Sequence, residues 1–255
     1  MSTMPAMEAT ISVGVYGLGR FGSFWAKELA KHGFPVIGYG RSAKAAPEGV
    51  LLGSEDEVLS CSALFYCVSI SSFSEVLDRT SSRIADHTVV MDTCSVKLYP
   101  AKLMREKLPK QVQCIATHPM FGPDSGKNGI AGLPLVISGV RCEDETLQRW
   151  VEEFRRWDLK VLQMSCDQHD REAAWSQGIT HFIGRTLSEL SLGETELATT
   201  GYKTLLTVMQ QTCNDPLQLF YDLQRYNPYA RQMRMGLKGA LDTVMDALKK
   251  QEEGR

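Results

Sequence analysis

Residues 11–22 read Ile11-Ser-Val-Gly-Val-Tyr-Gly-Leu-Gly-Arg-Phe-Gly22, and this stretch determines the expected fold class. Its first six residues are typical of a buried strand, and its glycines have the G-x-G-x-x-G spacing at the start of a predicted helix. In that context the glycines allow a tight turn, close approach of a pyrophosphate, and packing of the helix on the strand. A tight turn without a ligand is the alternative interpretation. The pattern predicts a dinucleotide site that includes Gly17, Leu18, Gly19, Arg20, Phe21 and Gly22.

Strand and helix patterns alternate from residue 11 to about residue 165. The first helix is expected to end at Lys31-His-Gly33, a cationic last turn followed by a glycine cap. Alternation of this kind is typical of an α/β fold with a doubly wound, mainly parallel sheet of the Rossmann type. Further strands are predicted at 35–38, 63–69, 88–91, 112–116, 133–138 and 160–164, and further helices at 73–84, 96–108 and 143–157.

After Cys166 the strand patterns stop and the rest of the chain reads as helix. Breaks are predicted near Gly193, Gly201, Asp215 and Asn227-Pro228. We therefore expect a dinucleotide-binding domain over residues 10–165 and an all-α domain over residues 166–255. The helical part is too rich in apolar side chains to bury them alone, which predicts packing against the first domain and a homodimer. These side chains are Leu205, Leu206, Val208, Met209, Leu217, Leu219, Phe220, Tyr221 and Leu223.

Composition excludes several classes of partner. The 255 residues are 43% hydrophobic and 23% charged, with a formal net charge of −2, which gives no reason to expect nucleic acid or an anionic membrane. The seven cysteines show no CxxC pair and no metal-ligand spacing, so we expect reduced thiols, no metal and a cytoplasmic protein. No signal peptide or membrane span is expected, and a plastid location stays open if a transit peptide has been removed.

The second predicted strand ends in Gly38-Tyr-Gly-Arg-Ser-Ala-Lys44, where the choice of dinucleotide is normally made. NAD enzymes usually carry an acid here, but the first acid after this strand is Glu48. Arginine, serine and lysine side chains at Arg41, Ser42 and Lys44 suit a ribose 2′-phosphate, which predicts NADP rather than NAD. The alternative is that these charges are merely solvated. Val68 and Ser69, at the end of the predicted strand 63–69, are assigned to the same cofactor site.

A histidine lies on a rigid turn in Thr117-His-Pro-Met-Phe-Gly-Pro-Asp-Ser-Gly126. Histidine titrates near neutrality and can accept a proton at working pH. A second histidine, His181, follows Gln177 by four residues in a predicted helix, so both side chains can point in one direction. A glycine loop together with such histidines indicates an oxidoreductase that moves a hydride and a proton. A hydrogen-bonded structural role is the alternative for His181.

These residues resemble the prephenate/arogenate dehydrogenase family, and most closely its plant-type arogenate dehydrogenases. The resemblance rests on the glycine loop, on segments 90–97, 117–126 and 177–182, and on Thr212-Cys-Asn-Asp-Pro with the Leu-Phe-Tyr that ends at residue 221. It implies hydride transfer from C4 of a cyclohexadienol to NADP, loss of CO₂ and aromatisation, in tyrosine biosynthesis. It also implies a helical dimerisation domain and an active site between the two domains.

By this resemblance His118 is the base that accepts the C4 hydroxyl proton, and Ser95 hydrogen-bonds the same hydroxyl. A neutral base is required, so activity is expected to fall at acid pH. Gln177 and His181 are implied to contact the substrate, and Ser125 and Thr199 are assigned to the same site.

Asp215 stands where arogenate-selective members have an acid. A carboxylate there attracts the ammonium group of arogenate and gains nothing from the keto group of prephenate. The alternative is that Asp215 only caps the next helix. We expect arogenate as substrate, with prephenate as the alternative. The partners of the substrate carboxylates stay open among Lys203, Arg225, Arg231 and Arg234.

Two other functions compete with this one. A different two-domain NADP oxidoreductase, such as a β-hydroxyacid dehydrogenase or imine reductase, would share the fold but typically uses a lysine in the helical domain. A non-catalytic, redox-sensing NADP-binding protein would not need Ser95, His118, Gln177 and His181 together.

Overall fold

The computed structural model describes residues 11–43 and 45–254. The chain divides into two compact units, Met1–Cys166 and Asp167–Arg255, which are described separately. None of the helices in the described part of the chain is long and apolar enough to cross a membrane.

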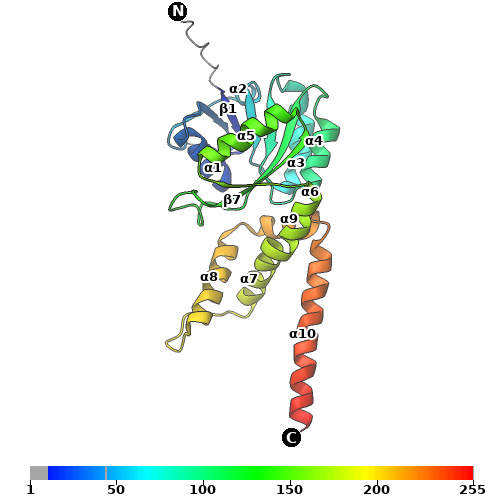
Figure 1. Ribbon diagram of the computed structural model, residues 1–255. Coiled ribbons are helices and arrows are strands. Elements are labelled where there is room, and N and C mark those ends of the chain that lie inside the picture. The colour runs from blue at the N-terminus through cyan, green and yellow to red at the C-terminus, as the bar shows by residue number, and fades with distance from the viewer. Residues whose placement is uncertain (1–10, 44, 255) are drawn as a thin grey trace, which may run out of the picture. The chain divides into compact units, whose positions relative to one another are not determined.

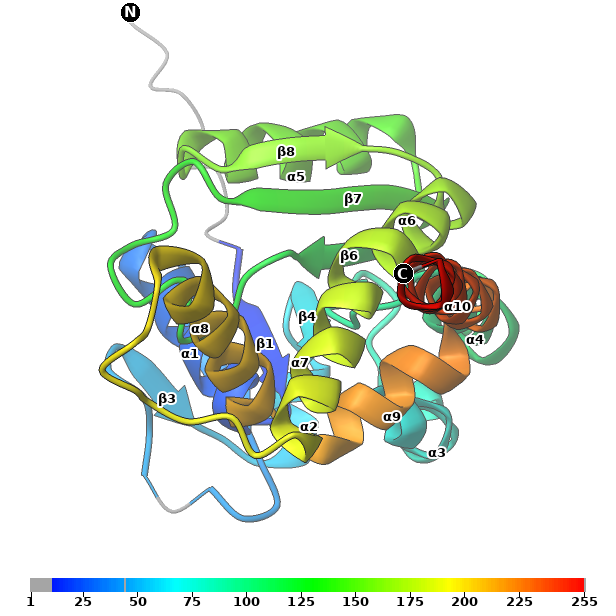
Figure 2. The same ribbon diagram turned by 90° about the horizontal axis from the view of Figure 1, so that it is seen from below.

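The first unit is built on one eight-stranded sheet with the order β3-β2-β1-β4-β5-β6-β7-β8 (Figures 1 and 2). β6 and β7 are antiparallel and every other neighbouring pair is parallel. The predicted doubly wound, mainly parallel sheet is therefore confirmed. The strands are β1 (Val13–Tyr16), β2 (Val36–Tyr39), β3 (Val50–Leu52), β4 (Ala63–Tyr66), β5 (Val89–Asp92), β6 (Gln113–Pro119), β7 (Pro134–Arg141) and β8 (Lys160–Gln163).

Helices cover both faces of the sheet. Successive residues of a strand point to opposite faces, so each face carries apolar side chains that a helix buries. On β4, Phe65 belongs to an aromatic core with Trp25 and Trp150 from the helices α1 and α5. The next residue, Tyr66, packs with Phe73 of α3 on the other face. The helices of this unit are α1 (Arg20–Lys31), α2 (Glu55–Leu59), α3 (Ile70–Thr80), α4 (Leu98–Lys107), α5 (Asp144–Arg156) and the 3₁₀ helix η1 (Ser81–Arg83).

Two short elements were not predicted from the sequence. β3 has only three residues, and Leu51 and Leu52 are exposed at the edge of the sheet, so no buried pattern marks it. α2 has five residues but carries a readable signal at its start. The Ser54 hydroxyl accepts from the backbone N–H of Glu57 while the Glu57 carboxylate accepts from the Ser54 N–H, a complete capping box.

The second unit is helical over residues 167–254. Its breaks lie at 190–199, 215–216 and 227–229, so the break expected near Gly201 ends two residues earlier, at residue 199. Thr199 explains this, because its hydroxyl caps a helix that starts at the next residue and runs through Gly201. The elements are α6 (Cys166–Ala173), which starts at the boundary, the π-helix η2 (Ala174–Gly178), α7 (Ile179–Glu189), α8 (Thr200–Asn214), α9 (Leu217–Tyr226) and α10 (Ala230–Glu253).

Candidate functional site

The glycine loop joins β1 to α1 and has the geometry of an anion cradle. Gly17 has φ +107°, and a Cβ on it would lie 2.5 Å from the carbonyl oxygen of Cys67. A Cβ on Gly22 would lie 1.8 Å from the carbonyl oxygen of Gly17, so α1 packs on the loop only because Gly22 has no side chain. A Cβ on Gly19 would meet nothing within 4 Å. The backbone at the start of α1 is thus open to a ligand, where helix N–H groups favour phosphate.

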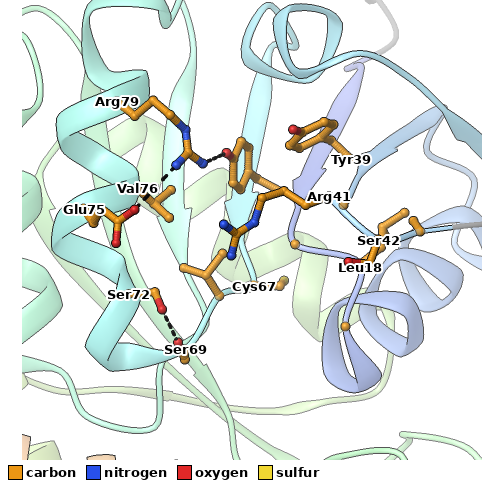
Figure 3. Close-up of a pocket in the computed structure, with 16 residues that line it drawn as sticks. Leu18, Tyr39, Arg41, Ser42, Cys67, Ser69, Ser72, Glu75, Val76 and Arg79 are labelled. Carbon is orange, nitrogen blue, oxygen red and sulfur yellow. Dashed lines mark hydrogen bonds and ion pairs between the residues drawn. The ribbon is translucent and has the colours of Figure 1, made fainter.

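A cavity of about 340 Å³ lies against this loop (Figure 3). It extends from the glycine loop to the residues that follow β2 and β4, which lie on either side of β1 in the sheet. In Figure 3 the Arg41 side chain reaches into the cavity from one side, and α3 forms the opposite wall. The predicted cofactor residues that line it are Gly17, Leu18, Gly19, Arg41, Ser42, Val68 and Ser69.

The other predicted cofactor residues do not line this cavity. The Arg20 guanidinium forms an ion pair with Asp124, at 2.6 Å between Nη2 and Oδ1. Phe21 packs against the core and stacks on Trp25, and Gly22 is buried against the loop. Lys44 lies outside the described residues.

Sequence reasoning missed the α3 wall of the cavity. Ser72, Glu75, Val76 and Arg79 line it at helical spacing, and this spacing within the predicted helix was the signal that could have identified them. Arg79 donates to the hydroxyl of Tyr16 and pairs with Glu55. The other lining residues that were not predicted are Tyr16, Tyr39, Gly40, Ala43 and Cys67.

Two titratable side chains of the cavity lining, Tyr16 and Cys67, are not poised for chemistry. Burial, reinforced by Glu55, raises the pKa of Tyr16 to about 12. Burial raises the pKa of the Cys67 thiol to about 12, so it stays protonated and unreactive at neutral pH. The cavity is therefore suited to binding.

None of the described residues that directly follow β2 and line the cavity is an acid. Tyr39, Gly40, Arg41 and Ser42 line it in succession, while the Glu48 carboxylate is held 2.6 Å from the Lys27 ammonium and does not line it. The acid in the lining is Glu75 on the opposite wall, 3.9 Å from Arg79. The residues present fit a dinucleotide with an anionic group near Arg41.

Ser95 follows β5, and His118 lies in the last part of the neighbouring strand β6, at the same edge of the sheet. β5 ends at Asp92, which is paired with Ala116 of β6, and half-buried Ser95 is in the loop that follows. His118 lies two residues beyond Ala116, is 2% exposed, and is held opposite Val136 of β7. Parallel pairing thus brings the two predicted catalytic residues to one region, the carboxyl end of the parallel strands, where ligands bind in such sheets.

Ser125 lies in the turn after β6, where its hydroxyl accepts from the backbone N–H of Gly122 at 3.0 Å. Its side chain is exposed. The same turn packs closely on α1: a Cβ on Gly126 would lie 2.6 Å from the Phe24 ring, so the contact requires glycine.

Two buried charged residues, Asp92 and Lys97, flank Ser95 and form an ion pair with no exposed surface. Both bond to backbone groups of Thr117, the residue before His118. Sequence reasoning assigned them no role, although both stand in the quoted segment 90–97.

The helical unit brings three of its predicted substrate residues into one region. Gln177 lies in the π-helix η2, a rare form of helix that is frequent at functional sites. His181 is 6% exposed, and its Nε2 lies 3.9 Å from Oδ2 of Asp215. The buried Oε1 of Gln177 and Nδ1 of His181 have no hydrogen-bond partner among the described residues. Buried polar atoms of this kind are rare and require a partner such as a ligand or water.

The charge of His181 is set by its surroundings. Burial lowers the pKa of His181 below its ordinary value, the Arg185 guanidinium lowers it further, and the Asp215 carboxylate opposes both. Neutral imidazole is therefore the expected form at neutral pH.

Thr199 is separated from this group. Its hydroxyl caps the start of α8, whereas Asp215 follows the end of that 15-residue helix. Since each helical residue adds 1.5 Å, the two lie about 22 Å apart. The predicted substrate residues Thr199 and Asp215 are thus not brought together.

Two family models match parts of the chain. "Prephenate dehydrogenase, nucleotide-binding domain" matches residues 25–133, and "TYRAAT1-like, C-terminal domain" matches residues 186–255. The chloroplastic arogenate dehydrogenase 1 of Arabidopsis thaliana is 38% identical over 234 residues, covering 87% of this chain and 37% of the relative. Arogenate dehydrogenase 2 of the same plant, also chloroplastic, is 34% identical over 264 residues, covering 97% of this chain and 71% of the relative.

Solved structures show the same fold. Synechocystis arogenate dehydrogenase superposes with a TM-score of 0.70 at 19% identity, covering 95% of this chain and 93% of the other. Prephenate dehydrogenase from A. aeolicus, in complex with hydroxyphenyl propionate and NAD⁺, superposes with a TM-score of 0.75 at 17% identity, covering 97% and 94%.

Proposed function

This chain belongs to the prephenate/arogenate dehydrogenase family, and we propose that it catalyses the NADP-dependent oxidative decarboxylation of L-arogenate to L-tyrosine. The observation that carries the proposal is the pairing of β5 with β6, which puts buried His118 and the Ser95 loop at the sheet edge where the glycine cradle also opens. The nicotinamide would accept a hydride from C4 of the substrate when bound.

The chain's own residues would supply positioning and would move one proton. His118 accepts the proton of the C4 hydroxyl as the hydride leaves C4, and the Ser95 hydroxyl orients that group. The C1 carboxylate then leaves as CO₂, and its bonding electrons complete the aromatic ring while the C4 oxygen becomes a phenolate. That oxygen takes the proton back from His118, which gives the phenol of tyrosine and restores the base. Gln177 and His181 each carry a buried polar atom that a substrate can satisfy.

Cofactor choice follows from the end of β2. Arg41 and Ser42 line the cavity there and no acid does, which favours the 2′-phosphate of NADP over the free ribose hydroxyl of NAD. Gly17 and Gly19 would hold the pyrophosphate at the start of α1.

Arogenate is favoured over prephenate by Asp215. Its carboxylate lies 3.9 Å from His181, beside the unpartnered polar atoms, and would attract the substrate ammonium. Both Arabidopsis relatives are named arogenate dehydrogenases. Prephenate is the alternative substrate.

The helical unit is proposed to form a homodimer. Along α10 the side chains of Leu241, Val244, Met245 and Leu248 are 55–65% exposed at helical spacing. A second copy of the chain would bury this stripe. For the compartment, the chloroplast location in the names of both Arabidopsis relatives supports a plastid rather than the cytosol.

The test is the initial rate of nicotinamide reduction with arogenate or prephenate, each with NADP or NAD. Arogenate with NADP is expected to be the fastest of the four pairs, and His118→Gln should abolish most of that rate while NADP still quenches tryptophan fluorescence. Turnover of prephenate alone would leave the family chemistry intact but exclude arogenate. No turnover with any pair, or full activity of His118→Gln, would overturn the proposal.

A further inference from the structure

Strand β6 extends beyond the end of its neighbour β5. The parallel ladder ends with Asp92 opposite Ala116, yet β6 continues through Thr117 and His118, paired on its other side with Ile137 and Val136 of β7. The backbone N–H and C=O of Thr117 that face β5 therefore have no strand residue to pair with. A buried backbone group without a partner costs about as much as a lost hydrogen bond.

Two side chains take the place of the missing strand. Oδ1 of Asp92 accepts from the Thr117 N–H at 3.3 Å, and Nζ of Lys97 donates to the Thr117 carbonyl oxygen. The Thr117 hydroxyl also donates to the carbonyl oxygen of Asp92. The outcome is that every hydrogen-bonding group of Thr117 on this side is held by Asp92 or Lys97.

The same pair also fixes the loop that carries Ser95. Oδ2 of Asp92 accepts from the Cys94 N–H at 3.0 Å and from the Lys97 ammonium, so the loop folds around its carboxylate. Asp92, Ser95 and Lys97 thus belong to one closed turn, which is bonded to the residue next to His118.

The attraction between the two charges does not by itself account for this pair. Both side chains have no exposed surface, and taking two charges out of water costs about as much as their attraction returns. Apolar residues of the same volume would usually serve a fold as well. What apolar residues cannot do is bond two backbone groups of one strand and one of a neighbouring loop.

We propose that Asp92 and Lys97 are positioning residues that fix His118 relative to Ser95. The effect on turnover rests on the proposed function, whereas the effect on the strand does not. Neither side chain needs to touch the substrate, because both act through Thr117 and the loop.

The test compares Lys97→Met with a matched control, Arg141→Met. Arg141 of β7 also donates to backbone carbonyl oxygens, those of Arg105, Leu108, Pro109 and Val112, but beside the start of β6. Both variants lose a cation that satisfies backbone, so both should unfold at a lower temperature than wild type. At a temperature where all are folded, only Lys97→Met should lose kcat, on the order of tenfold or more, with NADP affinity within about twofold of wild type.

A double-mutant cycle with His118→Gln separates positioning from general damage. If Lys97 acts through His118, then Lys97→Met should lower kcat little or not at all when His118 is already replaced. An equal fold-loss in both backgrounds, or wild-type kcat for Lys97→Met, would overturn the proposal. If Lys97→Met does not fold, Asp92→Asn takes its place in the cycle, since it keeps the shape of the side chain and removes the charge that holds Lys97.

Hydrogen exchange supplies a readout that needs no activity. The backbone N–H groups of Ala116, Thr117, His118 and Met120 should exchange faster in Lys97→Met than in Arg141→Met. Faster exchange in an enzyme that turns over neither substrate would refute the proposed function and keep the positioning role. Unchanged exchange in these amides would refute the positioning role itself.

Discussion

Arg41 is the residue on which the cofactor preference depends most directly. It follows β2 by two positions, reaches into the cavity, and is accompanied by Ser42 rather than by an acid (Figure 3). Arg41→Ala should raise the KM for NADP about tenfold to a hundredfold, since a charge-assisted hydrogen bond contributes about 1.5–3 kcal/mol. The KM for NAD should change little. Initial rates with both cofactors measure this, and Lys27→Ala, an exposed cation outside the cavity, is the control.

Asp215 is the corresponding residue for the substrate. Asp215→Asn keeps the shape of the side chain but removes the charge that would attract an ammonium group. The kcat/KM for arogenate should fall about tenfold while that for prephenate stays level or rises. Asp246→Asn, on the exposed surface of α10, is the matched control. An arogenate-to-prephenate ratio that does not move would contradict the assignment.

Single residues also show where sequence reasoning ends. The roles of Gly17 and Gly22 follow from spacing alone, because few residues other than glycine could occupy those positions. The role of Asp92 and Lys97 does not, because it depends on β6 extending three residues beyond β5. Strand ends of this kind are set by tertiary pairing, which local pattern does not encode.

At the scale of elements, long amphipathic segments were predictable and short ones were not. The expected helix at 143–157 is α5 at Asp144–Arg156, and the expected strand at 112–116 is the first part of β6. β3 and α2 are too short for a periodic signal. The π-helix η2 has no sequence signature either, although it carries Gln177 and comes directly before α7.

The α7 helix gives a prediction on pH. Because burial lowers the pKa of His181 from its ordinary value of 6.5, the unfolded chain takes up a proton at this site before the folded chain does. Stability is therefore lost as pH falls through and below 6.5. Between about pH 7.5 and about pH 5.5, the Tm of wild type should drop more than that of His181→Gln.

Asp215→Asn is expected to change the pH dependence of Tm in the direction opposite to His181→Gln. The Asp215 carboxylate partly offsets the shift, so removing it should lower the pKa of His181 further and steepen the loss of Tm on acidification. Equal Tm losses in wild type, His181→Gln and Asp215→Asn would show that His181 does not titrate differently in the folded protein.

At the scale of the whole molecule, the sequence predicted the strands, helices and domains more reliably than the contacts between residues. A doubly wound, mainly parallel sheet could be expected from strand–helix alternation, and with it the common edge that carries the glycine loop, Ser95 and His118. The full strand order could not be expected, since β3 was not predicted. The α3 wall of the cavity was missed, although the helical spacing of its residues could have indicated it. The separation of Thr199 from Asp215 was missed as well, and it follows from the length of α8. Residue spacing within one helix predicted which side chains lie on the same side, whereas spacing across a loop did not predict which side chains share a site.

The exposed stripe on α10 predicts the state of association. The first turns of α10 contain buried Ala230 and Met233, whereas Leu241, Val244, Met245 and Leu248 are exposed on one side of the same helix. Wild type should therefore sediment at twice the mass of the chain at micromolar concentration.

Replacing Leu241 and Leu248 together by Glu should give the monomer, because two charges per copy would have to be buried at the interface. The control reverses two charges on the opposite side of α10, Asp246→Lys with Lys250→Glu, and should stay dimeric. Circular dichroism at the same concentration shows whether each variant remains folded. A monomeric wild type would contradict the proposed homodimer. A Leu241/Leu248 variant that still sediments as a dimer would show that the interface lies elsewhere on the chain.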